Sequence, residues 1–331
     1  MCLSWSNRCF AACALIAAHC VLAAAPAAGT PSSNRYAAWR AAAAQALSTR
    51  GDANSLATAA ALSFLAPPRA RGDSPAPRSA AVDLAAKASD LDPNSAGIGW
   101  LRLQLCAGTQ GCDIRDAATT MRWVDADNSA VWMATLAVAQ KDKDSEEVTR
   151  ILQEMAHGSR FDVYRNRTIV LMFETLKKAQ DELPKGYVPS DLSRLSEAIA
   201  LAGAEIVPPF APLLAACRDL SGTDRRENCL KVSKLMQRGD AVSAQMAGFT
   251  IEKRLWPQDA KEAHMVAERR RTLEWRVSAA SEYDAPALPW LANALARARV
   301  REMHTASREE DVDIAILRRH NIPLEPPESF Q

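Results

Sequence analysis

The sequence predicts an all-α protein, built as an irregular α-solenoid of antiparallel helix pairs. Hydrophobic residues make up 48% of the 331 residues but aromatic residues only 6%, and much of the hydrophobic fraction is alanine. Alanine has the highest helix propensity, whereas β-branched and aromatic residues favour strands. No run of alternating apolar and polar residues is long enough for a sheet. Caps, glycines and prolines divide the chain into roughly 12–14 helices.

Residues 1–28 have the pattern of a secretory signal peptide. Arg8 supplies positive charge, residues 9–22 are apolar except for His19, and residues 23–28 offer small side chains for cleavage. The apolar run is shorter than the roughly 20 residues that span a bilayer. We therefore expect a cleaved leader and a periplasmic or secreted protein, with no stable membrane insertion of the mature chain.

The charge of the mature chain is balanced. Arg8 is the only charged residue before Arg35, so loss of the leader leaves 39 basic and 39 acidic residues. Such a balance lacks the basic surface that nucleic-acid binding requires. We expect a protein or peptide partner and no nucleic acid.

Four of the eight cysteines lie in the leader, and the mature chain keeps Cys106, Cys112, Cys217 and Cys229. An even number of cysteines in an exported chain indicates disulfides. Three pairings are open, and the simplest joins Cys106 to Cys112 and Cys217 to Cys229. Zinc is disfavoured because CxxC spacing is absent and no histidine lies near either pair, so we expect no metal and no cofactor.

The sequence predicts a succession of short helices in the first half of the chain. Residues 34–65 predict an N-terminal helix pair, and residues 66–78 a Pro-rich linker. The helices predicted in this half are 34–49, 54–65, 80–90, 96–105, 114–124, 130–140, 145–157 and 163–178.

A period of 34 residues runs through part of this half. The turn at 92–96 contains Asn94, Asn128 follows 34 residues later, and a further 34 residues reach Asp162 at the start of another helix. Over about residues 79–178 the chain resembles a degenerate tetratricopeptide-repeat protein, in which helix pairs recur at this period. The resemblance implies tetratricopeptide-like repeats over residues 79–183, with a surface that binds a protein or peptide.

Residues 190–320 predict a C-terminal helical domain without that period, which either packs as a separate layer or continues the solenoid. Ser307 and Glu310 have the spacing of a capping box for the last helix. The proline-containing tail, 321–331, should lie extended on the surface. The helices predicted here are 191–202, 210–220, 225–237, 242–255, 257–281, 288–303 and 307–320.

The sequence predicts no catalytic site. It contains no HExxH, GxSxG, Walker or dinucleotide glycine motif. Glu174 and Glu205 are the carboxylates in the most apolar surroundings, and we interpret both as helix-face residues. The three consecutive arginines 269–271 are flanked by glutamates and predict a solvated helix face.

Tryptophans are the candidates for partner contacts, because exposed aromatic residues anchor protein interfaces. Six lie at predicted helix ends or on amphipathic faces, and we select Trp100 and Trp132 as binding residues. The function expected is a non-catalytic interaction or assembly scaffold. The alternatives are an exported inhibitor or immunity protein that neutralises a secreted toxin, and an enzyme that acts on the cell wall.

Overall fold

A computed structural model describes residues 33–64, 76–205, 207–218, 223–258, 260–284 and 291–330. These residues form 15 α-helices and one 3-10 helix, and no β-strand, which confirms the all-α prediction. The predicted signal peptide and most of the Pro-rich linker lie outside the described residues. None of the described helices is long and apolar enough to cross a membrane.

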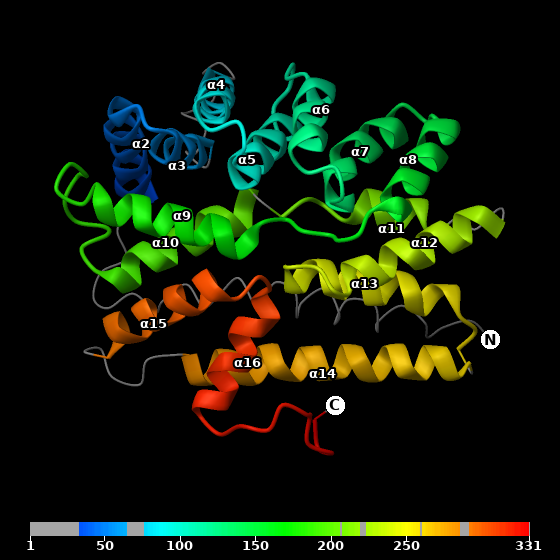
Figure 1. The fold of residues 1–331 in the computed structure, drawn as a ribbon. Helices are drawn as coiled ribbons and strands as arrows, with labels where there is room; N and C mark the ends of the chain where they lie inside the picture. Colours follow the sequence, from blue (N-terminus) through cyan, green and yellow to red (C-terminus); the bar gives the residue numbers. More distant parts are fainter. Residues whose placement is uncertain are drawn as a thin grey trace, which may run out of the picture.

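The first helices form a row along the top of Figure 1. Each helix from α2 to α6 packs against the next one in sequence, and α7 packs against α8. The bounds of the elements in this row are α2 (Ser33–Arg50), α3 (Ala53–Phe64), α4 (Ala76–Leu91), α5 (Ala96–Ala107), α6 (Ile114–Val124), η1 (Ser129–Trp132), α7 (Met133–Lys141) and α8 (Ser145–His157).

Helix α9 (Arg165–Lys178) connects this row to the rest of the molecule. It lies below the row in Figure 1 and contacts α3, α5, α10 and α15. The predicted break at 184–189 falls between α9 and α10, yet these two helices pack against each other. A single cluster of buried residues extends from Trp39 to Leu317, so both sides of the break share one core.

The remaining helices form the lower layers, in which α12 packs on α8 and on α13, α13 on α14, and α14 on α16. Their bounds are α10 (Asp191–Glu205), α11 (Ala211–Ala216), α12 (Thr223–Met236), α13 (Val242–Leu255), α14 (Lys261–Asp284), α15 (Ala292–Thr305) and α16 (Glu309–Arg319).

Small residues permit the close approach of these helices. Ala57, Ala59, Ala60 and Ala61 of α3 are fully buried. Gly248 of α13 faces α12 so closely that an added Cβ would lie 2.7 Å from the carbonyl oxygen of Ser233. The alanine-rich composition that predicted helices therefore also determines how closely they pack.

The four described cysteines form two pairs at disulfide distance. The Cα atoms of Cys106 and Cys112 are 5.3 Å apart, and those of Cys217 and Cys229 are 5.7 Å apart. The first pair joins the two sides of the α5–α6 turn and the second joins α11 to α12. The simplest of the three possible pairings is the one in the structure.

The predicted capping box at the start of the last helix is wrong. Arg308 is the N-cap residue of α16, and its side chain accepts no capping hydrogen bond. The side chain of Glu310 instead pairs with Arg276 of α14 at 2.8 Å. The Glu309 carboxylate accepts a hydrogen bond from the backbone N–H of Val242, 3.0 Å away at the start of α13. Glu309 therefore pairs with a backbone N–H group in the first turn of α13, which has no partner within that helix, and does not cap its own helix α16.

The segment 158–164, which connects α8 to α9, is held in place by two side chains from other connections between helices. These are Asn128, which precedes η1, and Asp240, which precedes α13. On one side, the Asn128 amide donates to the carbonyl oxygen of Asp162 at 2.8 Å and accepts from its backbone N–H at 2.9 Å. On the other side, the Asp240 carboxylate accepts from the backbone N–H groups of Val163 at 2.7 Å and Arg165 at 3.0 Å. The segment also forms an isolated parallel bridge with residues 127–129, in which the N–H of Ser159 donates to the carbonyl oxygen of Asp127 and the N–H of Ser129 donates to that of Arg160, each at 2.9 Å. The side chains of Asn128 and Asp240 satisfy backbone groups beyond this bridge.

Candidate interaction surfaces

Trp100 and Trp132, the two tryptophans predicted to bind a partner, differ in their exposure to solvent. Trp100 is 0% exposed and packs against Tyr164, with ring centroids 6.1 Å apart. It cannot contact a partner at the surface, so its selection as a binding residue is wrong. Trp132 is half-buried at the end of η1 and keeps part of its ring exposed.

Trp132 lies between two arginines from neighbouring helices. The guanidinium carbon of Arg122 (α6) is 4.4 Å from its ring centroid, and that of Arg150 (α8) is 5.5 Å away. Both distances suit cation–π attraction. We call Arg122, Trp123, Trp132 and Arg150 the α6–α8 surface.

The two arginines of this surface repel each other. Burial, followed by the charge of Arg150, lowers the pKa of Arg122 below its ordinary value. Glu147 offsets this repulsion, because it accepts two hydrogen bonds from Arg150, both at 2.7 Å. A further anionic group brought to this surface would be attracted to the same pair of cations.

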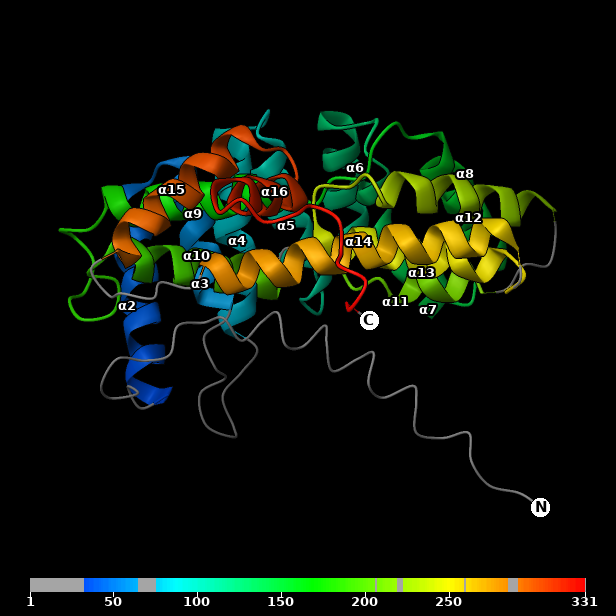
Figure 2. The same cartoon turned by 90° about the horizontal axis from the view of Figure 1, so that it is seen from below.

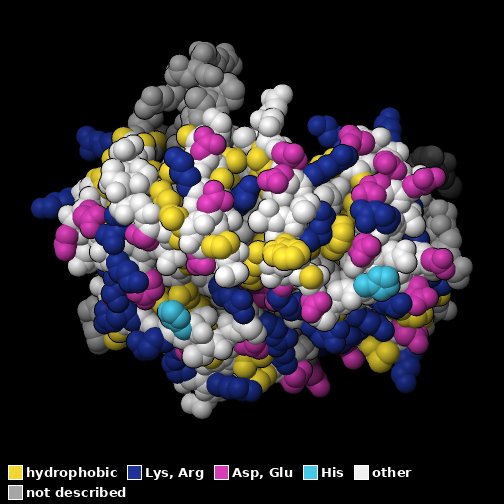
Figure 3. Space-filling view, turned by 45° about the horizontal axis from the view of Figure 1, so that its top comes forward, with side chains coloured by type: hydrophobic (Ala, Val, Ile, Leu, Met, Phe, Trp, Pro, Cys, Tyr) yellow, Lys and Arg dark blue, Asp and Glu magenta, His cyan; other side chains and the backbone are white. Residues whose placement is uncertain are grey.

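Trp123 is the most exposed large hydrophobic residue in the described part of the chain, at 90%. Ile114, Ala117 and Met121 follow the helical spacing of the buried side of α6, and Trp123 lies two residues after Met121, on the other side. The helical periodicity of α6 was therefore the signal that could have singled out Trp123. Figure 3 shows the face in which the top of Figure 1 is turned forward, and there exposed hydrophobic side chains lie among basic and acidic ones.

A second surface lies on α14, which holds the C-terminal tail in a non-helical conformation that ends in a turn at 327–330 (Figure 2). The Trp275 indole N–H donates to the carbonyl oxygen of Pro323 at 2.9 Å. Arg271 donates to the carbonyl oxygens of Pro327 and Phe330, each at 2.8 Å. The prediction of a non-helical tail is confirmed, while the interpretation of all three consecutive arginines as a solvated face is wrong for Arg271.

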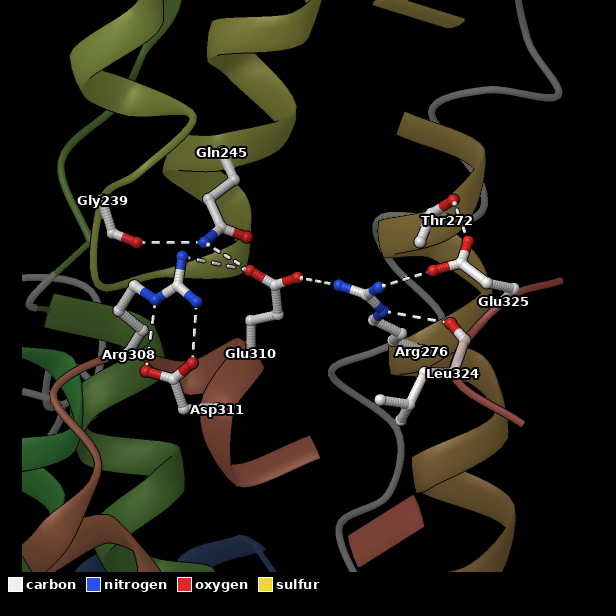
Figure 4. Close-up of polar contacts among 9 residues, drawn as sticks. All are labelled: Gly239, Gln245, Thr272, Arg276, Arg308, Glu310, Asp311, Leu324 and Glu325. Carbon is white, nitrogen blue, oxygen red and sulfur yellow. Dashed lines mark hydrogen bonds and ion pairs between the residues drawn. The ribbon is translucent and has the colours of Figure 1, made fainter. Parts of the chain in front are cut away.

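Arg276 lies at the centre of the polar contacts in Figure 4. It donates to the carbonyl oxygen of Leu324 at 3.1 Å and to the Glu325 carboxylate at 3.2 Å. On its other side it binds Glu310 at 2.8 Å, and Glu310 in turn accepts from Gln245 of α13 at 3.3 Å. The tail is thereby connected through polar side chains to α14, α16 and α13.

The remaining tryptophans have other roles. Arg226 lies over the Trp256 ring, 5.5 Å from its centroid. Trp290 lies outside the described residues.

A cleft of about 350 Å³ lies between the α2–α3 turn, α9 and α15. Its lining includes Glu174, one of the two glutamates noted in the sequence, together with Asp52, Arg167 and His304. The side chain of Glu205, the other glutamate, is outside the described set. In the described part of the chain, no group of three or more His, Cys, Asp or Glu side chains is placed to hold a metal ion.

Two buried aspartates have raised pKa values, although neither lies in this cleft. Burial raises the pKa of Asp240 to about 7, and the hydrogen bonds from Val163 and Arg165 act in the opposite direction. Burial also raises the pKa of Asp125, which binds Arg160 and Tyr164. Both carboxylates bind the 158–165 region, which gives them a structural role.

Comparison with known protein families, with characterised proteins and with solved structures finds no match to this chain.

Proposed function

We propose that this chain is an exported, non-catalytic scaffold that binds another protein through the α6–α8 surface. The observation that carries the proposal is the 90% exposure of Trp123. Tryptophan and arginine are the residues most enriched among those that dominate interface energies. Trp123 directly follows Arg122 in α6, and both Arg122 and Arg150 lie over the ring of a second tryptophan, Trp132.

The architecture in this proposal is an α-solenoid, tetratricopeptide-like in its N-terminal half. Its support is that helices α2 to α6 pack each against the next. Stacked helix pairs present extended surfaces, and binding of proteins or peptides is the usual role of such surfaces. The proposed location is the periplasm or the extracellular space, supported by the two cysteine pairs.

The partner should present an acidic residue beside an apolar pocket. An indole that is exposed on nearly all sides contributes to binding only when it enters such a pocket. An approaching carboxylate would relieve the repulsion between Arg122 and Arg150, which adds to burial in lowering the pKa of Arg122.

Site-specific photo-crosslinking in intact cells tests this proposal. A photoreactive amino acid at position 123 should give a discrete adduct with one protein. The same amino acid at the exposed position Lys87 of α4 is the matched control and should give no such adduct. Equal labelling from both positions would contradict the proposal. An adduct with a secreted toxin would identify the scaffold as an inhibitor or immunity protein.

The cleft favours a second candidate, an enzyme that acts on the cell wall, because glycan hydrolysis requires carboxylates and Glu174 and Asp52 both line it. Incubation of the purified protein with isolated cell wall tests this candidate. Release of soluble fragments that is lost in Glu174→Gln would support it, and an inert wild-type protein would exclude it.

A further inference from the structure

The C-terminal tail occupies α14 in the manner of a bound peptide. Residues Arg271, Thr272, Trp275 and Arg276 lie on one side of the helix, since their spacing is one, four and five residues. We call these four residues the α14 face. Each of them donates a hydrogen bond to the tail.

Most of these hydrogen bonds go to backbone carbonyl oxygens, those of Pro323, Leu324, Pro327 and Phe330. Carbonyl groups are common to every peptide, so this part of the recognition does not depend on the sequence of the tail. Prolines restrict the segment to extended conformations, which lowers the entropy lost when it binds.

Two side chains of the tail add specificity. The Glu325 carboxylate binds Arg276 at 3.2 Å and accepts from Thr272 at 3.3 Å. The Phe330 ring packs edge-on against Trp275, with centroids 5.3 Å apart. The α14 face therefore suits a segment that combines prolines, a glutamate and an aromatic residue.

The tail lies at the surface of the molecule. The side chain of Glu325 is 74% exposed even while it binds Arg276. Ile322 and Leu324, by contrast, pack against the core and anchor the first part of the tail. The outer part is thus held by the α14 face and connected to the fold by a short tether.

We propose that the α14 face is a docking site for an extended, proline-containing acidic peptide of a partner protein, and that the chain's own tail occupies it in the absence of that partner. A short tether gives the tail an effective concentration on the order of millimolar. A partner peptide at micromolar concentration therefore binds only when the tail is displaced. The inference goes beyond the proposed function, because it concerns a different face and holds whether or not Trp123 contacts a partner.

The test uses a fluorescent peptide with the sequence of residues 322–330 and measures its anisotropy. The full-length chain carries Leu324→Ser and Phe330→Ala, which weaken the tail and leave the α14 face intact. We expect this variant to bind the peptide at least tenfold more tightly than the wild type does. Adding Arg271→Ala should then weaken peptide binding at least tenfold.

Arg270→Ala is the matched control, because Arg270 pairs with Glu274 of its own helix at 2.8 Å and not with the tail. In the tail-weakened background it should leave peptide binding unchanged. A chain that ends at Asn321 serves as a second tail-free variant if the double substitution unfolds the protein. Loss of helical circular dichroism in both variants would show that the tail is an integral part of the fold and would overturn the proposal.

Two further outcomes would also overturn it. One is a tail-weakened variant that binds no peptide, or binds it equally well after Arg271→Ala. The other is a wild-type dimer that dissociates on Phe330→Ala, since this would assign the face to the tail of a second copy.

Discussion

Asn128 and Asp162 are 34 residues apart in sequence and form a reciprocal pair of hydrogen bonds, in which the amide side chain of Asn128 binds both the N–H and the carbonyl oxygen of Asp162. This separation equals the period of 34 residues noted in the sequence. Asn128 also accepts a hydrogen bond from the N–H of Ala130 and thereby caps η1. One side chain thus begins a helical turn and positions the segment that leads into α9.

Replacing Asn128 with alanine should destabilise the fold by roughly 2–4 kcal/mol, because it leaves two part-buried backbone groups of Asp162 without partners. Asn128 is 0% exposed. Urea unfolding followed by circular dichroism measures this loss. The control is Asn94→Ala at the previous, exposed position of the period, which should change stability by less than about 0.5 kcal/mol. Equal effects of the two substitutions would contradict this role of Asn128.

Removal of the Cys217–Cys229 pair by two alanine substitutions should cost about 3 kcal/mol, and removal of the Cys106–Cys112 pair about 2 kcal/mol. The order follows from the sequence separations of 12 and 6 residues. Thermal unfolding with and without reductant measures both effects. Identical melting temperatures under the two conditions, or free thiols in protein taken from its native compartment, would contradict the prediction.

The contribution of Asp240 to the stability of the protein should fall as the pH rises from about 4 to about 7. Asp240 has a pKa of about 7 in the folded chain, against about 3.9 in an unfolded one. Between these values the folded state binds more protons than the unfolded state, so the free energy of unfolding decreases with increasing pH. The loss is complete once the pH has passed the folded-state pKa.

Asp240→Asn should reduce this slope by up to about 1.4 kcal/mol per pH unit. Urea unfolding at four pH values between 4.5 and 7.5 measures it. Asp142→Asn, at an exposed position after α7, should retain the wild-type slope. Parallel profiles of the wild type and Asp240→Asn would refute this assignment.

Trp100→Ala and Trp123→Ala should differ sharply in their effect on stability. The first empties a fully buried site and should cost about 3–5 kcal/mol. The second removes an exposed ring and should stay within about 0.5 kcal/mol of the wild type. The same urea titration measures both variants, and a large loss in Trp123→Ala would show that this ring supports the fold.

The sequence predicted best those features that depend on neighbouring residues. Helices α6, α8 and α13 have the bounds that caps and periodicity indicated. Asp113 and Asp144 cap the first two of these helices through hydrogen bonds to N–H groups two or three residues later. The cysteine pairing could be predicted for the same reason, because the two residues of each pair are close in sequence.

Features that depend on distant residues could not be predicted in this way. Glu309 caps α13 across 67 residues, and Arg271 binds the carbonyl oxygen of Phe330 across 59 residues. Trp100 is buried because residues from other helices cover it, among them Tyr164. Local spacing contains no information about which helix will lie opposite a given side chain.

The way in which the 158–164 segment is held restricts how this protein can evolve. Asn128 binds the segment at Asp162, and Asp240 binds the adjoining residues Val163 and Arg165. Insertion of a single residue between Asp162 and Val163 would shift the bonds to Asn128 relative to those to Asp240, so that the two sets could no longer form together. We expect descendants of this sequence to conserve the length of this stretch, while exposed turns such as 142–144 tolerate insertions.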